Sequence, residues 1–179
     1  MNISVFGGSQ PKPGEKSYQD AILLGKYLGE AGHTVLTGGY IGTMEAISRG
    51  AAEAGGHVIG VTCREIEAWR SVRANPWVQE EWHYDTFRER LFALIDNCQI
   101  ALALPGGVGT LVEIGVTWNQ LIVEAISPRP LILIGQAWQV TFASFLANQD
   151  SYIPEADRHW LIFTPDVEGA MKLIKDYAK

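Results

Sequence analysis

The sequence is poor in cysteine and has no lysine in its central part. Cys63 and Cys98 are its two cysteines, and they stand in no metal-ligand spacing. We therefore expect no metal site and no disulfide, and we predict a reducing, cytoplasmic location. All six lysines lie at or before Lys26 or at or after Lys172, which leaves none in the centre for a pyridoxal Schiff base. We expect no cofactor.

Other signatures are also missing. No apolar run approaches the roughly 20 residues of a membrane span, and residues 1–6 resemble a first strand and not a signal peptide, so no membrane partner is expected. The net charge of −6 disfavours a nucleic-acid partner. The sequence contains neither a Gly-Lys-Ser/Thr nor a G-x-G-x-x-G segment, which argues against a P-loop nucleotidase and a dinucleotide-binding protein.

Glycine, by contrast, is abundant, and the most informative stretch is P-G-G-V-G-T-L-V-E at residues 105–113. It follows the apolar run 100–104, which is typical of a buried parallel strand, and leads into an amphipathic segment at 110–124. A strand, a glycine turn and a helix N-terminus together form a phosphate cradle, because glycines allow close approach to the amides of the first helical turn.

Strand-like and helix-like segments alternate along the chain, with a segment at 62–76 that we expect to be irregular and mobile, with a short helix near 65–69. This alternation predicts an α/β fold with one doubly wound, mostly parallel, Rossmann-like sheet and helices on both faces, in a single domain over residues 1–179. Strands are expected at 3–6, 33–37, 57–61, 78–84, 99–104, 130–134 and 160–163, and helices at 18–31, 42–54, 87–97, 110–124, 137–147 and 167–177.

Ligands of such folds bind beyond the carboxyl ends of the strands. Three glycine-containing turns follow predicted strands, so they should meet at one edge of the sheet. The helix after the fourth strand would bring Arg88 and Arg90 to the same edge, near Glu113. Besides Arg88, the predicted phosphate-binding residues are Gly8, Ser9, Gly38, Gly39, Gly42, Gly106, Gly107, Gly109 and Thr110.

Each of these features also has a purely structural interpretation. Residues 110–113 and 86–89 both fit a helix capping box, and the arginines at 88 and 90 could simply be solvated. An arginine in a first helical turn opposes the helix dipole, however, which favours an anion-binding role. Trp118 is expected in the core or at a subunit interface, and the four histidines form no ligand-like cluster.

The motifs resemble the Lonely Guy (LOG) family of phosphoribohydrolases, whose members are also labelled possible lysine decarboxylases. The resemblance covers residues 3–134. It includes Gly7-Gly8-Ser9, the glycine loop at 37–45, the strand at 57–61, the full P-G-G-x-G-T-x-x-E motif and Thr117-Trp118-x-Gln120-Leu121 in the following helix.

The resemblance implies that Arg90 and Glu113 form the catalytic pair, and that no metal or cofactor takes part. The substrate would be a nucleoside 5′-monophosphate, cleaved at its N-glycosidic bond to a free base and ribose 5-phosphate. It also implies a homodimer, for which the helix carrying Trp118, Leu121 and Ile122 is the expected contact surface.

The sequence departs from the LOG pattern at several positions. Leu91 replaces the usual lysine, Thr37 and Glu45 replace glycines, and Val108 replaces an aromatic residue. Residues 37–51 also resemble a neighbouring branch that includes molybdenum-cofactor carrier proteins, which bind a pterin phosphate without cleaving a nucleotide. A carrier of a phosphorylated heterocycle is therefore the alternative hypothesis, and a nucleotide-sensing domain is a third.

Overall fold

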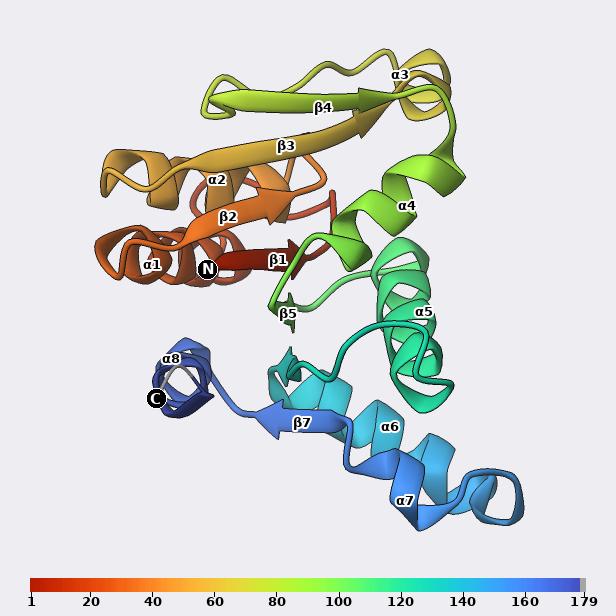
Figure 1. Cartoon of the computed structure of the whole chain (residues 1–179). Helices are drawn as coiled ribbons and strands as arrows, with labels where there is room; N and C mark the ends of the chain where they lie inside the picture. Colours follow the sequence, from red (N-terminus) through yellow and green to blue (C-terminus); the bar gives the residue numbers. More distant parts are fainter. Residues whose placement is uncertain (178–179) are drawn as a thin grey trace.

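The computed structural model describes residues 1–177, and within them seven strands form one parallel sheet (Figure 1). The strands lie in the order β4-β3-β2-β1-β5-β6-β7. Their bounds are β1 Asn2–Phe6, β2 Thr34–Thr37, β3 Val58–Cys63, β4 Glu80–Tyr84, β5 Ile100–Ala103, β6 Leu131–Ile134 and β7 Leu161–Thr164.

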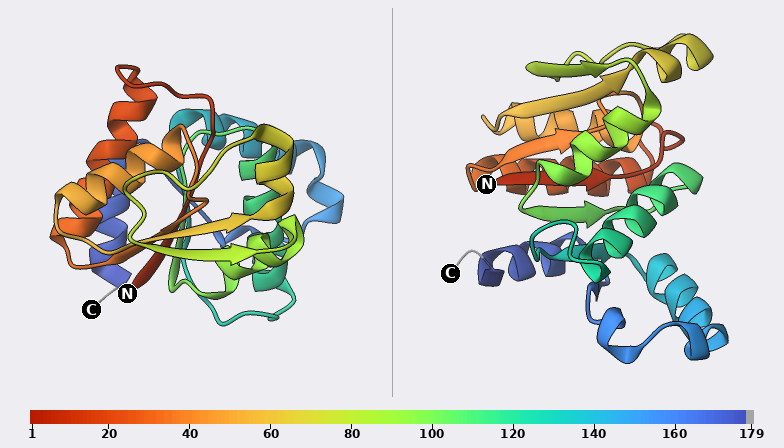
Figure 2. Two further views of the ribbon diagram at one scale, coloured as in Figure 1. Left: turned by 90° about the horizontal axis from the view of Figure 1, so that it is seen from above. Right: turned by 45° about the vertical axis from the view of Figure 1, so that its right-hand side comes forward.

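Helices cover both faces of the sheet, as Figure 2 shows. One face packs against α1 (Lys16–Glu30), α2 (Thr43–Glu53) and α8 (Val167–Tyr177), and the other against α4 (Phe87–Asp96), α5 (Val108–Ile122) and α6 (Gln136–Asn148). The short helices are α3 (Arg64–Arg70), the 3-10 turn η1 (Asp150–Tyr152) and α7 (Glu155–Arg158). The predicted doubly wound α/β fold is confirmed.

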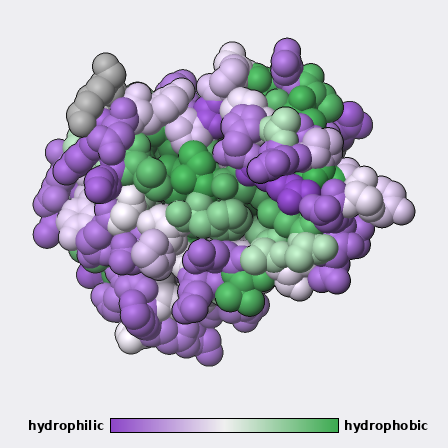
Figure 3. All heavy atoms as spheres, turned by 90° about the horizontal axis from the view of Figure 1, so that it is seen from below, coloured by the Kyte–Doolittle hydropathy of each residue, from purple (hydrophilic) through white to green (hydrophobic). Residues whose placement is uncertain are grey.

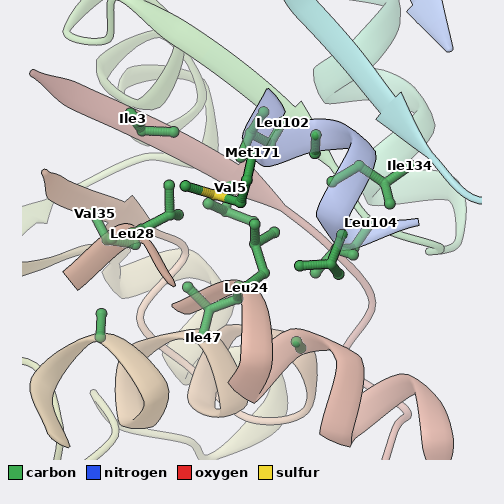
Figure 4. Packing of buried hydrophobic residues seen from close by; sticks show 14 of the residues in the cluster. Ile3, Val5, Leu24, Leu28, Val35, Ile47, Leu102, Leu104, Ile134 and Met171 are labelled. Atoms are coloured by element: carbon green, nitrogen blue, oxygen red, sulfur yellow. The ribbon is translucent and has the colours of Figure 1, made fainter. Parts of the chain in front are cut away.

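Successive side chains of a strand point to opposite faces of the sheet, so the core is divided into two layers. Ile3 and Val5 of β1 point toward α1, α2 and α8, where Figure 4 shows them beside Leu24 and Met171. Phe6 belongs to the opposite layer. The buried strands therefore read as continuous apolar runs, as expected of a parallel sheet that is covered on both sides.

The chain reverses its winding direction between β1 and β5, and this switch point is where doubly wound sheets open a crevice at their carboxyl edge. The turns after these two strands lie side by side. The Gly8 N–H donates to the Pro105 carbonyl at 3.4 Å, and a Cβ on Gly8 would lie 3.3 Å from the Cα of Gly106. Two segments nearly 100 residues apart thus form one surface.

Most predicted elements occur within three residues of their expected bounds, but three local predictions are wrong or incomplete. Helix α5 begins at Val108 with Gly107 as its N-cap, so Thr110 does not cap it, whereas the capping box of Thr86 and Glu89 is confirmed. The segment 62–76 is more regular than predicted, because β3 continues to Cys63 and α3 follows directly, although the short helix expected near 65–69 is confirmed as α3. The helices η1 and α7 were not predicted.

The predicted subunit-contact surface on α5 is largely used within the chain. Trp118 Nε1 donates to the Asp157 carbonyl at 2.8 Å, its ring packs edge-on against Phe142, and Leu121 is buried. Ile122 is half-buried. The α6–α7 segment covers this face of α5, which corrects the proposed contact surface, and the homodimer itself stays a prediction.

Strand β7 forms one edge of the sheet, and Figure 3 views the molecule from that side. Ile162 and Phe163 of β7 are half-buried, and the view shows apolar surface bordered by polar side chains.

No helix within residues 1–177 is both long and apolar enough to span a bilayer.

Helices α1 and α2 cross so closely that only glycine fits at the contact. A Cβ on Gly50 would lie 2.0 Å from the Ile22 carbonyl oxygen. We predict that Gly50→Ala lowers the free energy of unfolding by about 2 kcal/mol or more, because two backbones must separate. Urea unfolding measures this. The control Gly115→Ala, where a Cβ meets nothing within 4 Å, should stabilise by up to about 1 kcal/mol. Equal urea midpoints for the two variants would contradict the close crossing.

Candidate functional site

A cavity of about 880 Å³ opens at the carboxyl edge of the sheet, at the switch point between β1 and β5. Its wall is formed by the turn after β1, helix α3, the first turn of α4 and the segment 105–113. This volume is in the range of pockets that hold small organic ligands. The cavity lies at the edge where the sequence predicted the site.

The glycine motif presents free backbone amides to this cavity. Gly107 is the N-cap of α5, and no side chain caps the first turn of this helix. The first helical hydrogen bond runs from the Leu111 N–H to the Gly107 carbonyl. The amides of the preceding residues therefore lack helical partners. Gly106, Gly107 and Gly109 are exposed and line the cavity. This arrangement suits an anion, which the positive end of the helix dipole would also attract.

Thr110 lies beneath the glycine turn and also lines the cavity. A Cβ on Gly106 would come within 2.1 Å of the Thr110 hydroxyl. Glycine at 106 is therefore required for the chain to pass over the threonine. The turn therefore packs directly against the first turn of α5.

Arg90 of α4 and Glu113 of α5 meet at the cavity as a buried ion pair. Arg90 Nη1 lies 3.0 Å from Glu113 Oε1, and the two side chains are only 6% and 9% exposed. Arg90 Nε also donates to the Val61 carbonyl at 3.0 Å. Both residues line the cavity. The two residues predicted as a catalytic pair thus contact each other, although they lie on different helices.

Burial raises the pKa of Glu113, and the Arg90 guanidinium partly opposes that rise. Glu113 Oε1 holds Arg90, while Oε2 accepts no hydrogen bond within residues 1–177. One carboxylate oxygen is therefore fixed by the protein, and the other remains available to a ligand in the cavity. A carboxylate so held can orient water or stabilise a developing positive charge.

The three glycines of the second glycine turn are absent from the cavity lining, although Tyr40 of the same turn lines it. A Cβ on Gly38 would lie 2.0 Å from Arg90 Nη2, so this glycine makes room for the guanidinium. The Gly39 N–H donates to the Thr37 hydroxyl, and Gly42 packs against Ser9. The predicted phosphate contact of these three glycines therefore has no support from the cavity lining, and their observed role is to pack behind it.

The first glycine turn and Arg88 also differ in placement. Gly8 and Ser9 line the cavity as predicted. Arg88 is exposed and is absent from the lining. Residues two apart on a helix point in different directions, so a buried Arg90 turns Arg88 away from the cavity.

Sequence reasoning missed the wall formed by α3. Ile66, Trp69 and Arg70 line the cavity, and Phe87 of α4 joins them. The spacing of 66, 69 and 70 places three side chains on one helical face, which was an available signal in the short helix expected near 65–69.

Tyr40 holds the base of this wall. Its hydroxyl accepts the Cys63 N–H at 2.8 Å and donates to the Cys63 carbonyl at 3.1 Å. Burial raises the pKa of Tyr40 to about 12. The tyrosine therefore stays neutral near neutral pH and positions the junction of β3 and α3.

One group of side chains within residues 1–177 has donor spacing suited to a metal ion. Glu67, Glu81 and His83 bring ligand atoms within 4.8 Å of one another. Arg73 pairs with Glu67 at 2.6 Å and compensates its charge, and none of the three lines the cavity. The cavity itself is lined by glycines and apolar side chains together with two arginines and two glutamates, and its free glycine amides suit an organic anion.

Known proteins are similar to this chain in sequence and in fold. The profile of the SLOG cluster4 family matches residues 1–126. The chain belongs to the SLOG cluster4 family. Named relatives of this SLOG protein include the cytokinin riboside 5′-monophosphate phosphoribohydrolase LOG of Oryza sativa subsp. japonica, 34% identical over 98% of this chain and 73% of the relative. The enzyme of the same description from Rhodococcoides fascians is 28% identical, over 97% of this chain and 89% of the relative.

Solved structures of related fold carry a different description. A molybdenum cofactor binding protein from Rippkaea orientalis matches with a TM-score of 0.77 and 23% identity, over 99% of this chain and 97% of that chain. A Moco carrier protein from Chlamydomonas reinhardtii matches with a TM-score of 0.70 and 25% identity, over 99% of this chain and 98% of that one. The SLOG protein is thus similar in sequence to proteins described as phosphoribohydrolases and in fold to proteins described as molybdenum cofactor binding or carrier proteins.

Replacement of Arg90 tests the buried pair. Arg90→Leu leaves the Glu113 carboxylate buried without its cation, and we predict a loss of about 3–5 kcal/mol in the free energy of unfolding at neutral pH. An unpaired buried carboxylate has a raised folded-state pKa, so the folded chain binds more protons than the unfolded chain. The loss should therefore shrink as pH falls toward about 5.

Urea unfolding over a pH series provides the measurement. Arg88→Leu is the matched control on the same helix, and its exposed site predicts a change within about 0.5 kcal/mol. A deficit in Arg90→Leu that does not vary with pH would contradict the assignment.

Proposed function

We propose that this SLOG protein hydrolyses the N-glycosidic bond of a nucleoside 5′-monophosphate, releasing a free base and ribose 5-phosphate. The observation that carries the proposal is the buried Arg90–Glu113 pair, which lies on the cavity wall beside the free amides of α5. Relatives described as phosphoribohydrolases, at up to 34% identity, support it.

The glycine turn would bind the 5′-phosphate through the amides of residues 106–110, with the turn at Gly8 and Ser9 on the other side of the crevice. Glu113 is five residues beyond Val108, the first residue of α5. That spacing corresponds to about 7.5 Å along the helix axis. A ribose whose phosphate lies at the helix start would therefore have its anomeric carbon near the glutamate.

The chemistry follows from the charge that develops at that carbon. As the bond from C1′ to the base nitrogen breaks, its electron pair leaves with the base, and positive charge accumulates on the ribose. The Glu113 carboxylate stabilises this charge and orients a water molecule toward C1′. The water oxygen forms the new bond, and its proton passes to the glutamate or to the departing base. Arg90 holds the carboxylate in place.

The neutral variant Glu113→Gln tests this role. It keeps an oxygen acceptor for Arg90 but no negative charge, and we predict a loss of base release of about 100-fold or more, with nucleotide binding retained. Chromatography of free base after incubation with a panel of nucleoside 5′-monophosphates, including isopentenyladenosine monophosphate, measures turnover, and calorimetry measures binding. Glu65→Gln is the matched control, because it removes the other carboxylate that lines the cavity. Full activity in Glu113→Gln would disprove the mechanism.

The same pair predicts the pH dependence of turnover. Glu113 acts in its ionised form, and burial raises its pKa above the ordinary value of about 4.3. The acid limb of kcat/KM in the free enzyme should therefore have its midpoint above that value, since activity falls as the carboxylate gains a proton. A pH–rate profile tests this, and activity that remains full at about pH 4 would count against Glu113 as the ionised group.

A carrier of a phosphorylated heterocycle is the second candidate. Solved structures described as molybdenum cofactor binding or carrier proteins favour it, as does the apolar α3 wall of the cavity. The glycine amides would bind a pterin phosphate as readily as a nucleotide phosphate. Absence of base release from every nucleotide, together with retained binding of a phosphorylated pterin, would establish this function in place of hydrolysis.

A further inference from the structure

Arg70 reaches across the mouth of the cavity from α3. Its guanidinium carbon lies 4.4 Å from the centroid of the Trp69 ring, and its Nη1 donates to the Ser9 hydroxyl at 2.7 Å. Ser9 belongs to the turn after β1, 61 residues earlier in the chain. The guanidinium is therefore held between an aromatic ring on its own helix and a hydroxyl on the opposite side of the cavity.

Arg70 is also a positive charge that no carboxylate compensates. The other arginine on the cavity wall, Arg90, pairs with Glu113, while Glu65 accepts the Phe87 N–H at 2.7 Å. At the start of α3, Arg64 pairs with Asp85. Within residues 1–177, Arg70 forms no ion pair, although it lines the cavity. An arginine with a ring and a neutral hydroxyl as partners retains its full charge for a ligand.

The position of this charge matches the proposed phosphate site. Ser9 follows Gly8, whose N–H contacts the Pro105 carbonyl of the glycine motif. Arg70 therefore lies close to the turn that precedes α5. A helix N-terminus supplies only about half a positive charge, and a phosphate monoester carries close to two negative charges. An arginine fork is well suited to bind two phosphate oxygens at once.

We propose that Arg70 binds the phosphate of the ligand and is the residue that makes the site selective for a phosphorylated molecule. The contacts with Trp69 and Ser9 pre-organise the guanidinium, so little side-chain freedom is lost on binding. The choice of a nucleoside monophosphate as ligand rests on the proposed function, but the role of Arg70 applies equally to a phosphorylated pterin.

The test compares a ligand with and without its phosphate. Calorimetry in the slow Glu113→Gln background measures the affinities of adenosine 5′-monophosphate and adenosine. Arg70→Ala should weaken binding of the monophosphate by about 10- to 100-fold and leave adenosine binding unchanged. Arg70→Lys, which keeps the charge but lacks the fork, should recover part of the loss.

Two controls separate phosphate binding from a structural role. Arg64→Ala removes one positive charge from the same helix outside the cavity, and it should leave both affinities close to those of the parent protein. Ser9→Ala removes the hydroxyl that holds Arg70, and it should weaken monophosphate binding less than Arg70→Ala. If Arg70 only held α3 against the turn after β1, its replacement would weaken the binding of both ligands equally.

The outcomes separate this inference from the proposed function. If Arg70→Ala weakened the binding of both ligands equally, or of neither, the inference would be overturned. It would also be overturned if the parent protein bound neither the monophosphate nor a phosphorylated pterin. Base release by the wild-type protein is measured independently. Absent turnover together with a phosphate-selective loss in Arg70→Ala would reject hydrolysis and support Arg70 as the phosphate-binding residue.

Discussion

The ion pair between Arg90 and Glu113 is the constraint on which the site depends. Two charges taken out of water require a close partner and further hydrogen bonds, or the arrangement is strongly unfavourable. The structure satisfies this with a 3.0 Å contact and with the Val61 carbonyl. Each partner comes from a helix at the carboxyl edge of the sheet, so the pair forms only when β3, β5 and the elements around them are in register. The fold is thereby fastened at the place where the ligand is expected.

Glycines, which have no side chain, make this arrangement possible. Gly38 leaves space for the Arg90 guanidinium, Gly106 leaves space for the Thr110 hydroxyl, and Gly8 allows the turns after β1 and β5 to touch. Only the glycines of the turns after β1 and β5 line the cavity, while those of the turn after β2 pack beneath it. The same residue type therefore serves two purposes. One group exposes amides to a ligand, and the other brings charged groups and backbones close together.

This distinction also explains what could be predicted from the sequence. Periodicity predicts the alternating strands and helices, and the rule that parallel strands end at one edge predicts where the ligand binds. Motif resemblance predicts the candidate pair Arg90 and Glu113. The exclusion of Gly38 and Arg88 from the cavity does not, because it depends on strand order and on the direction in which α4 faces. A short helix near 65–69 was expected, but the contribution of α3 to the cavity wall was not, because that depends on how the chain packs at the edge of the sheet.

The two arginines of the cavity differ in whether a carboxylate compensates their charge, and this difference bears on the choice between hydrolysis and a carrier function. Arg90 is compensated by Glu113 and holds it in one geometry, so it adds little net attraction for an anion. Arg70 is uncompensated and attracts the anion without touching the carboxylate that would act on the sugar. In the proposed function, phosphate recognition and glycosidic chemistry would therefore rest on different residues of one crevice. A scaffold built this way can keep its affinity for phosphorylated ligands while catalysis is gained or lost, because only the placement of Glu113 against the ligand's anomeric carbon decides whether a bound nucleotide is cleaved.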